Sequence, residues 1–172
     1  PEYVPGHPLA QSAPEALKVY PLDWDVQAMV PLGEKLLLLS GEDTTELILM
    51  DRESLTVLAD YCLPFFLPEE GLHLDSGTLS CFDSTRQETL VLSTRLTEIS
   101  RIAAPEGLVG TSIYSGEDNT LYYCTDGAIR AWNLDSGIRR CVREQDYSGQ
   151  VLVEVHPGGI LQCQIQDGGA TR

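Results

Sequence analysis

The chain has 172 residues, 42% of them hydrophobic, and its 26 acidic and 11 basic residues give a formal net charge of −15. This size and composition allow a packed core, and the negative charge excludes nucleic acid as a partner because a phosphate backbone would be repelled. The longest apolar run, residues 36–39, is far too short to cross a bilayer, so the sequence predicts a soluble chain without a transmembrane segment.

The first 25 residues differ in composition from the rest. Prolines 1, 5, 8 and 14, with small and polar residues between them, predict an extended N-terminal segment or linker. This segment lacks the basic and apolar blocks of a signal peptide. Its tether-like composition, the acidic character of the chain and the lack of an initiating Met favour a cell-envelope or extracellular location over the cytoplasm. The five cysteines argue the opposite, because they include no close pair and predict buried thiols rather than disulfides or a zinc site.

Strand-like segments then recur at a nearly constant interval. Four equivalent segments begin at Lys35, Thr78, Thr120 and Ile160, which are 43, 42 and 40 residues apart. The interval divides the chain into units of approximately 26–64, 65–106, 107–148 and 149–172, the last incomplete. This is the length of a four-stranded propeller blade, whereas a β-sandwich has no such period. We therefore expect an all-β fold, a β-propeller or partial propeller of about three and a half four-stranded blades.

Within these units, short apolar or alternating runs between turn residues predict the strands. In chain order they are 26–30, 35–40, 46–51, 55–61, 71–75, 78–83, 89–94, 98–103, 110–115, 120–125, 128–134, 138–144, 151–156 and 159–165. Turn sequences such as Asp75-Ser76-Gly77 and Asp135-Ser136-Gly137 supply the positive φ that tight hairpins need. The only stretch with helical character is 13–18.

The connection between the first two units, residues 61–70, is the first candidate site. It places Phe65 and Phe66 between two prolines and before a pair of acidic residues. If these rings are exposed, Tyr61, Phe65 and Phe66 form a protein-binding loop. The alternative is that they pack between adjacent blades and seal the core.

Aromatic residues also gather in the third unit. Tyr122, Tyr123, Trp132 and Tyr147 could form a platform on which a glycan stacks, and Tyr147 is the binding candidate among them. Core packing is the alternative for Trp132. The acidic loops 41–46 and 116–119 are predicted to be solvated turns rather than calcium sites.

One segment of the third unit resembles a known group of propellers. Ile129-Arg130-Ala131-Trp132-Asn133-Leu134-Asp135-Ser136-Gly137 is similar to the third strand and following turn of tryptophan-aspartate-repeat or quinoprotein-like bacterial propellers. Asn133 stands where that family has Asp, and the Gly-His pair that opens its repeat is missing from every unit. The resemblance implies a bacterial propeller and identifies no subfamily.

Two predicted first strands carry histidine and carboxylate side chains. Strand alternation places His73 with Asp75 on one face, and Glu154 with His156 on one face. First strands line the central channel of a propeller, so these four residues are weak candidates for an acid-base or metal site. The alternative is that a water-filled channel prefers polar side chains. Compact catalytic and nucleotide-binding motifs are absent, and the sequence predicts no cofactor and no metal ion.

The sequence as a whole predicts a non-enzymatic propeller scaffold that binds an unknown protein, peptide or glycan through its loops. One alternative is a propeller enzyme that acts on a glycan with its channel carboxylates and histidines. Another is a structural half-propeller that self-associates as a homodimer. Because propellers close rings of about 4 to 8 blades, we also expect additional blades from a longer chain, from a second copy, or from residues 1–25.

Overall fold

The computed structural model of the chain describes residues 21–125, 128–144, 150–156, 160–167 and 170–171. These residues form fifteen β-strands and one short 3-10 helix, η1 (Glu69–Gly71), and none of their helices has the length and apolar character to cross a bilayer. The strands are β1 (Val26–Leu32), β2 (Lys35–Ser40), β3 (Thr45–Asp51), β4 (Val57–Leu63), β5 (His73–Asp75), β6 (Thr78–Asp83), β7 (Glu88–Ser93), β8 (Glu98–Ala103), β9 (Val109–Ser115), β10 (Thr120–Thr125), β11 (Ala128–Asn133), β12 (Arg139–Glu144), β13 (Gln150–His156), β14 (Ile160–Asp167) and β15 (Ala170–Thr171).

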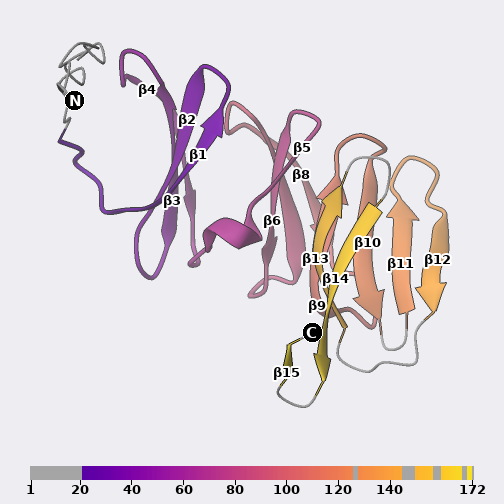
Figure 1. The fold of residues 1–172 in the computed structure, drawn as a ribbon. Helices are drawn as coiled ribbons and strands as arrows, with labels where there is room; N and C mark the ends of the chain where they lie inside the picture. Colours follow the sequence, from indigo (N-terminus) through magenta and orange to yellow (C-terminus); the bar gives the residue numbers. More distant parts are fainter. Residues whose placement is uncertain (1–20, 126–127, 145–149, 157–159, 168–169, 172) are drawn as a thin grey trace, which may run out of the picture.

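Three four-stranded antiparallel sheets follow one another along the chain. Strands β1 to β4 form blade 1, β5 to β8 blade 2, and β9 to β12 blade 3, and in each blade consecutive strands pair with their neighbours. The last three strands form a smaller sheet, in which β13 packs beside β9 and β10. Figure 1 shows the three blades side by side in chain order, with β13 and β14 against blade 3. The fold is therefore all-β and propeller-like with three blades, which confirms the prediction from the repeat spacing.

The central strands are apolar because both of their faces are covered. In β2, the four residues Leu37 to Ser40 are all buried, and β3 is buried from Leu47 to Met50. A strand covered on both faces needs a continuous apolar run rather than an alternating one. The outer strand β4 shows the contrasting pattern, since only its last residue, Leu63, is fully buried.

The side-chain register of the repeat is the same in all three blades. The second residue of β6, Leu79, packs against blade 1, and the second residue of β10, Leu121, packs against blade 2. The third residues point the other way, so that Leu37 of β2 packs against blade 2. Because a shift of one residue would exchange the two faces of a strand, this common register gives each blade one face for the preceding blade and one for the following blade.

Blade 1 is the first in the row, so the face that the other blades turn to a preceding blade has no blade against it among the described residues. Leu38, Ile48 and Met50 of this face are nevertheless buried, and Trp24, Val26 and Leu55 pack on them. These contacts bury apolar surface at this end of the row of blades.

Several strand boundaries differ from the sequence prediction by one or two residues. Strand β4 begins at Val57 instead of residue 55, because Leu55 has a φ of +56° in the preceding turn and cannot continue a strand. Strand β5 begins at His73 because residues 69–71 form η1. The predicted strand 46–51 begins one residue earlier, at Thr45. The predicted helical stretch 13–18 lies outside the described residues.

The prediction of buried thiols is right for two of the four described cysteines and wrong for two. Cys81 and Cys124, on the central strands β6 and β10, are buried, whereas Cys62 and Cys141 are exposed. The exposed pair lies on β4 and β12, which are the outer strands of their blades and have one open edge. None of the four forms a disulfide.

Candidate functional site

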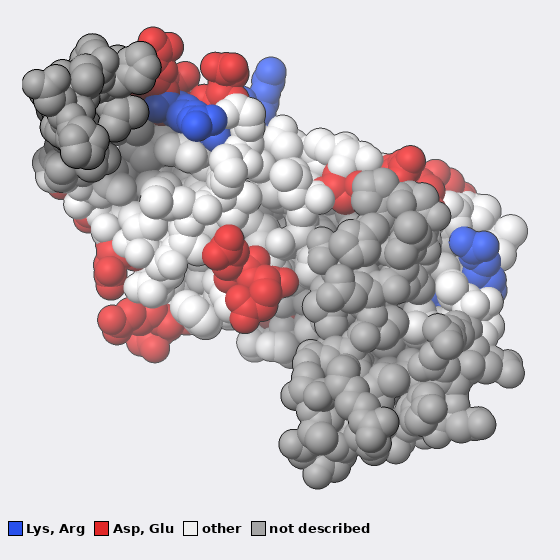
Figure 2. All heavy atoms as spheres, in the orientation of Figure 1, with Lys and Arg blue, Asp and Glu red and all other residues white. Residues whose placement is uncertain are grey.

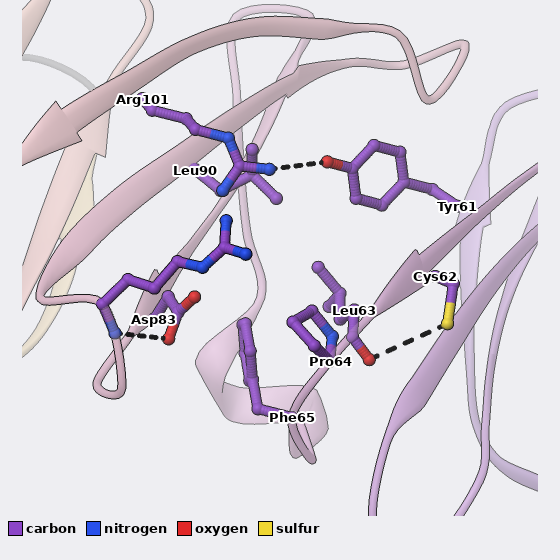
Figure 3. Close-up of a pocket in the computed structure, with 9 residues that line it drawn as sticks. Tyr61, Cys62, Leu63, Pro64, Phe65, Asp83, Leu90 and Arg101 are labelled. Carbon is purple, nitrogen blue, oxygen red and sulfur yellow. Dashed lines mark hydrogen bonds between the residues drawn. The ribbon is translucent and has the colours of Figure 1, made fainter.

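A pocket of about 270 Å³ lies between blades 1 and 2 (Figure 3). Blade 1 and the connection after it contribute one wall, and blade 2 contributes the other. The lining residues are Tyr61, Cys62, Leu63, Pro64, Phe65, Asp83, Arg86, Leu90 and Arg101. Two of the three aromatic residues that the sequence predicts as a binding loop, Tyr61 and Phe65, therefore border this pocket.

The connection that follows β4 is fixed in place by burial and by one hydrogen bond. Leu63 and Leu67 are buried in the cluster between the two blades, and the backbone N–H of Leu67 donates to the Thr45 hydroxyl at 2.7 Å. Phe65, between these anchors, packs against the same cluster and borders the pocket. Phe66 points away from the core and is 48% exposed. The connection thus combines both roles considered for it, with one ring in the wall and one ring open to solvent.

Arg101 links the two blades at the mouth of the pocket. Its guanidinium donates to the Tyr61 hydroxyl at 3.0 Å (Figure 3) and to Glu88 and Glu98, each at 2.8 Å. The Tyr61 hydroxyl in turn donates to Glu98 at 2.9 Å. Burial and the neighbouring Glu98 carboxylate raise the pKa of Tyr61, and the hydrogen bonds from Arg101 and Tyr61 lower the pKa of Glu98. Arg101 is therefore a structural bridge whose charge is matched by two carboxylates.

Asp83 and Arg86 occupy the turn between β6 and β7. One oxygen of Asp83, Oδ1, accepts the backbone N–H groups of Thr85 at 2.9 Å and Arg86 at 3.1 Å. This arrangement is an Asx turn, in which a carboxylate replaces a backbone acceptor. The Arg86 side chain is 58% exposed, and its ion pair with Glu88 is long, at 3.9 Å.

Asp75, one of the predicted channel residues, joins blade 2 to blade 3. Its Oδ2 accepts the Ser115 hydroxyl at 2.7 Å and the backbone N–H of Gly116 at 2.9 Å. Gly116 is required there, since a Cβ would lie 2.6 Å from Thr78 Oγ1 and 2.8 Å from the Asp75 carbonyl oxygen. These contacts give Asp75 a structural role.

The other predicted site residues lie in different places. His73 is partly buried on β5, in the same strand as Asp75. Glu154 and His156 lie on β13, where the side chains are outside the described part of the chain, and Tyr147 is also outside it. Within the described ranges, no group of three or more His, Cys, Asp or Glu side chains is placed to hold a metal ion.

The aromatic residues of blade 3 belong largely to its interior. Tyr122 and Tyr123 are each 2% exposed, and Trp132 packs against the cluster between blades 2 and 3. The Arg139 guanidinium lies 4.3 Å from the centre of the Trp132 ring, a cation–π contact on its outer side. Trp132 therefore packs in the core, the alternative that the sequence analysis gave for it. Tyr122, Tyr123 and Trp132 do not form an exposed aromatic platform.

No protein-family model matches the chain, and no curated protein matches it either. Among solved structures, the chain is similar to the hydrazine synthase of Kuenenia stuttgartiensis, with a TM-score of 0.49 and 16% sequence identity. The likeness covers 90% of this chain and 46% of that one, so this chain spans less than half the length of the solved protein. The propeller-like fold is established by the three blades themselves, independently of this likeness.

Sequence reasoning missed Asp83, Arg86 and Arg101. Asp83 ends β6, Arg86 lies in the turn that follows it, and Arg101 lies on β8. They meet Tyr61 and Phe65 only when the two blades pack together. One local signal was available, because Asp83-Ser84-Thr85-Arg86 follows a strand and is a typical Asx-turn sequence. That signal predicts a turn and says nothing about the pocket beside it.

Proposed function

We propose that the protein is a non-enzymatic scaffold of the propeller type that binds a polypeptide segment at the pocket between blades 1 and 2. The observation that carries the proposal is the aromatic pair of the 64–68 connection, in which Phe65 borders the pocket and Phe66 is half exposed beside it. Exposed aromatic residues beside a concave, partly apolar site are typical of protein interfaces, where they act as anchors.

A polypeptide is favoured over a glycan by the size and lining of the pocket. Its volume of about 270 Å³ falls below the roughly 300 to 1,000 Å³ of sites that enclose a whole small ligand. Leu63, Pro64 and Leu90 make part of the wall apolar. Such a pocket suits one side chain of a segment whose remaining residues lie across Phe66.

Retention of random heptapeptides on the immobilised full chain tests this function. We expect Phe66→Ala to lower peptide retention about tenfold, as truncation of an aromatic anchor does. Ile138→Ala is the matched control, because Ile138 is 64% exposed on blade 3, away from the pocket, and should leave retention unchanged. Equal retention by the unmodified chain and the Phe66→Ala variant would refute the proposed function.

A further inference from the structure

The charged side chains that line the pocket between blades 1 and 2 are mostly basic, which is the reverse of the chain as a whole. Arg86 and Arg101 line the pocket with one carboxylate, that of Asp83, and the three groups sum to one positive charge. The chain has 26 acidic and 11 basic residues, and Figure 2 shows acidic side chains spread over one face of the molecule, where basic ones are few. A positive pocket on an acidic protein favours a ligand group with a negative charge.

The carboxylate of Asp83 serves the turn that carries Arg86. Asp83 is 2% exposed, and its Oδ1 accepts the backbone N–H groups of Thr85 and Arg86. These bonds hold the carboxylate within its own turn, as in other Asx turns. Asp83 therefore fixes the position of the Arg86 backbone beside the pocket.

The two arginines of the pocket differ in how well their charges are matched. Nη1 of Arg101 lies 2.8 Å from Glu88 Oε1, whereas Nη1 of Arg86 lies 3.9 Å from the same oxygen, too far for a hydrogen bond. Arg101 also donates to Glu98 and to the Tyr61 hydroxyl. The Arg86 side chain is 58% exposed, so its guanidinium is the cation of the pocket that a ligand can reach and pair with.

The surface next to the pocket limits the ligand to a single carboxylate. Glu69 and Glu70 are exposed in η1, shortly after Phe66 in the chain. Like charges across an interface repel each other, so acidic residues beside the bound carboxylate would weaken binding. We therefore expect a segment in which one acidic residue is flanked by neutral or basic ones.

The remaining lining of the pocket suits a carboxylate on a short apolar stem. The Phe65 ring and the Leu63 and Leu90 side chains offer contacts to methylene groups, and Arg86 lies on the same lining. A guanidinium pairs with a carboxylate through two parallel N–H···O bonds, because the two planar groups match in geometry. Glutamate combines such a carboxylate with two methylene groups, and a pocket of about 270 Å³ has room for one side chain of this size.

We propose that the pocket between blades 1 and 2 receives a glutamate side chain of the partner polypeptide, with the Arg86 guanidinium donating to its carboxylate. This inference rests on the proposed function, since it names the side chain through which the bound segment is recognised. Phe66 then contacts a flanking residue of the segment.

The test uses heptapeptide pools that are acetylated and amidated at their ends, with a fixed central residue and no charged residue or Cys elsewhere. The central residue is glutamate, glutamine or lysine, and retention is measured on the immobilised full chain. Glutamine keeps the size of glutamate without its charge. A fourth pool, with central glutamine and a free C-terminal carboxylate, presents the same anion from the end of the chain. We expect the glutamate pool to be retained about fivefold better than the other three, as for an ion pair at a partly exposed site.

Two arginine substitutions separate the pocket from the overall charge of the protein. Arg86→Gln removes the guanidinium at the pocket and should make the retention of the glutamate and glutamine pools equal. Arg95→Gln is the matched control, because Arg95 is an exposed arginine in the turn between β7 and β8, outside the pocket lining, and its loss changes the net charge by the same amount. The control should keep the fivefold preference. Far-UV circular dichroism of both variants checks that the β fold is kept.

The outcomes separate the two proposals. Equal retention of the glutamate and glutamine pools, with both sensitive to Phe66→Ala, overturns the glutamate inference and leaves the binding function standing. A glutamate preference that survives Arg86→Gln, or that Arg95→Gln also abolishes, overturns the assignment of the carboxylate to this pocket. Retention of the free-carboxylate pool equal to that of the glutamate pool overturns the side-chain source, and preference for the lysine pool overturns the sign of the ligand. Failure of every pool to exceed its retention by the Phe66→Ala variant refutes the binding function itself.

Discussion

The two interfaces between the blades are held by different kinds of contact. The interface between blades 1 and 2 is an aliphatic cluster in which leucines predominate, including Leu37, Leu49, Leu79 and Leu90. The interface between blades 2 and 3 has a smaller apolar cluster and adds buried or partly buried hydrogen bonds, whereas the bonds of Tyr61 with Arg101 and Glu98 between blades 1 and 2 are exposed. The bonds between blades 2 and 3 are the buried contact of 2.6 Å between the Thr89 and Ser112 hydroxyls and the bonds from Ser115 and Gly116 to Asp75.

This difference shows how the chain fixes blade geometry while leaving room for a site. Apolar contacts are non-directional, so the leucine cluster can stabilise blades 1 and 2 while they enclose a pocket at one end. Hydrogen bonds depend on distance and angle, so Asp75 and the hydroxyl pair determine how blade 3 sits on blade 2. The pocket accordingly lies at the apolar interface, and the polar interface is occupied by structural contacts.

The largest effect should come from a cavity in the leucine cluster. Leu49 is 1% exposed, and Leu49→Ala should lower the free energy of unfolding by about 3 kcal/mol, from lost burial and the cavity left behind. Equilibrium denaturation in urea measures the change. Leu58→Ala, at a residue 49% exposed on the neighbouring strand, should change the same quantity by less than about 0.5 kcal/mol. Similar losses in the two variants would contradict the assignment of this cluster as the core between the blades.

A smaller loss is expected from the connection between blades 2 and 3. Asp75→Ala leaves the Ser115 hydroxyl and the Gly116 N–H without their acceptor and should lower the free energy of unfolding by about 2 kcal/mol. Asp60→Ala is the control, since Asp60 is an exposed aspartate on β4. A stability loss from Asp75→Ala no greater than that from Asp60→Ala would remove the structural role and revive the channel hypothesis for this carboxylate.

The hydroxyl pair at the same interface can be isolated by a double-mutant cycle. Thr89→Val keeps the shape of the side chain, and Ser112→Ala removes the partner hydroxyl. The coupling energy in the free energy of unfolding should be about 1 kcal/mol, the net value of a typical buried hydrogen bond. Additive effects of the two substitutions would show that this hydrogen bond does not contribute to the free energy of unfolding. The two interfaces would then both be stabilised mainly by apolar contacts.

The burial of Cys81 in the apolar interface should make the free energy of unfolding depend on pH, by about 1 kcal/mol. Burial, followed by the nearby Asp83 carboxylate, raises the pKa of Cys81 from 9.0 to about 12. Below pH 9 the thiol is protonated in both states, and between pH 9 and 12 only the unfolded state releases the proton, so stability falls as pH rises.

Comparison of the unmodified chain with Cys81→Ala at pH 7 and pH 10 measures this effect. The unmodified chain should lose about 1 kcal/mol more of its free energy of unfolding than the variant does over this interval. Other groups titrate in both proteins and cancel in the difference. An identical loss in both proteins would mean that water reaches Cys81 within the leucine cluster.

The repeat architecture could be predicted from the sequence because it depends on periodic features. Segments of continuous apolar residues at a blade-length interval identify β2, β6 and β10, and turn residues mark their ends. The turn after β11 also follows from local chemistry, since Asn133 accepts the backbone N–H and hydroxyl of Ser136. Asp51 makes the same contacts with Ser54 in blade 1, so Asn133 and Asp51 form the same kind of turn.

The pocket could not be predicted in the same way. Its walls are assembled from segments up to 40 residues apart, as in the bond between Tyr61 and Arg101, and no short motif links them. The function of Asp75 was equally hidden, because alternation within β5 places its side chain on a face but does not reveal the backbone N–H of Gly116 in the next blade. Aromatic residues in the 64–68 connection did give a usable signal, since Phe65 borders the pocket.

The most direct test of the binding site uses the thiol of Cys62, which is exposed and lines the pocket. With Cys141 and Cys163 replaced by Ser, the rate of Cys62 alkylation is measured with and without the heptapeptides that the immobilised chain retains. A bound segment should cover the pocket and slow the alkylation, and the Phe66→Ala variant should weaken this protection. An alkylation rate unchanged by peptide that is demonstrably bound would contradict the pocket between blades 1 and 2 as the binding site.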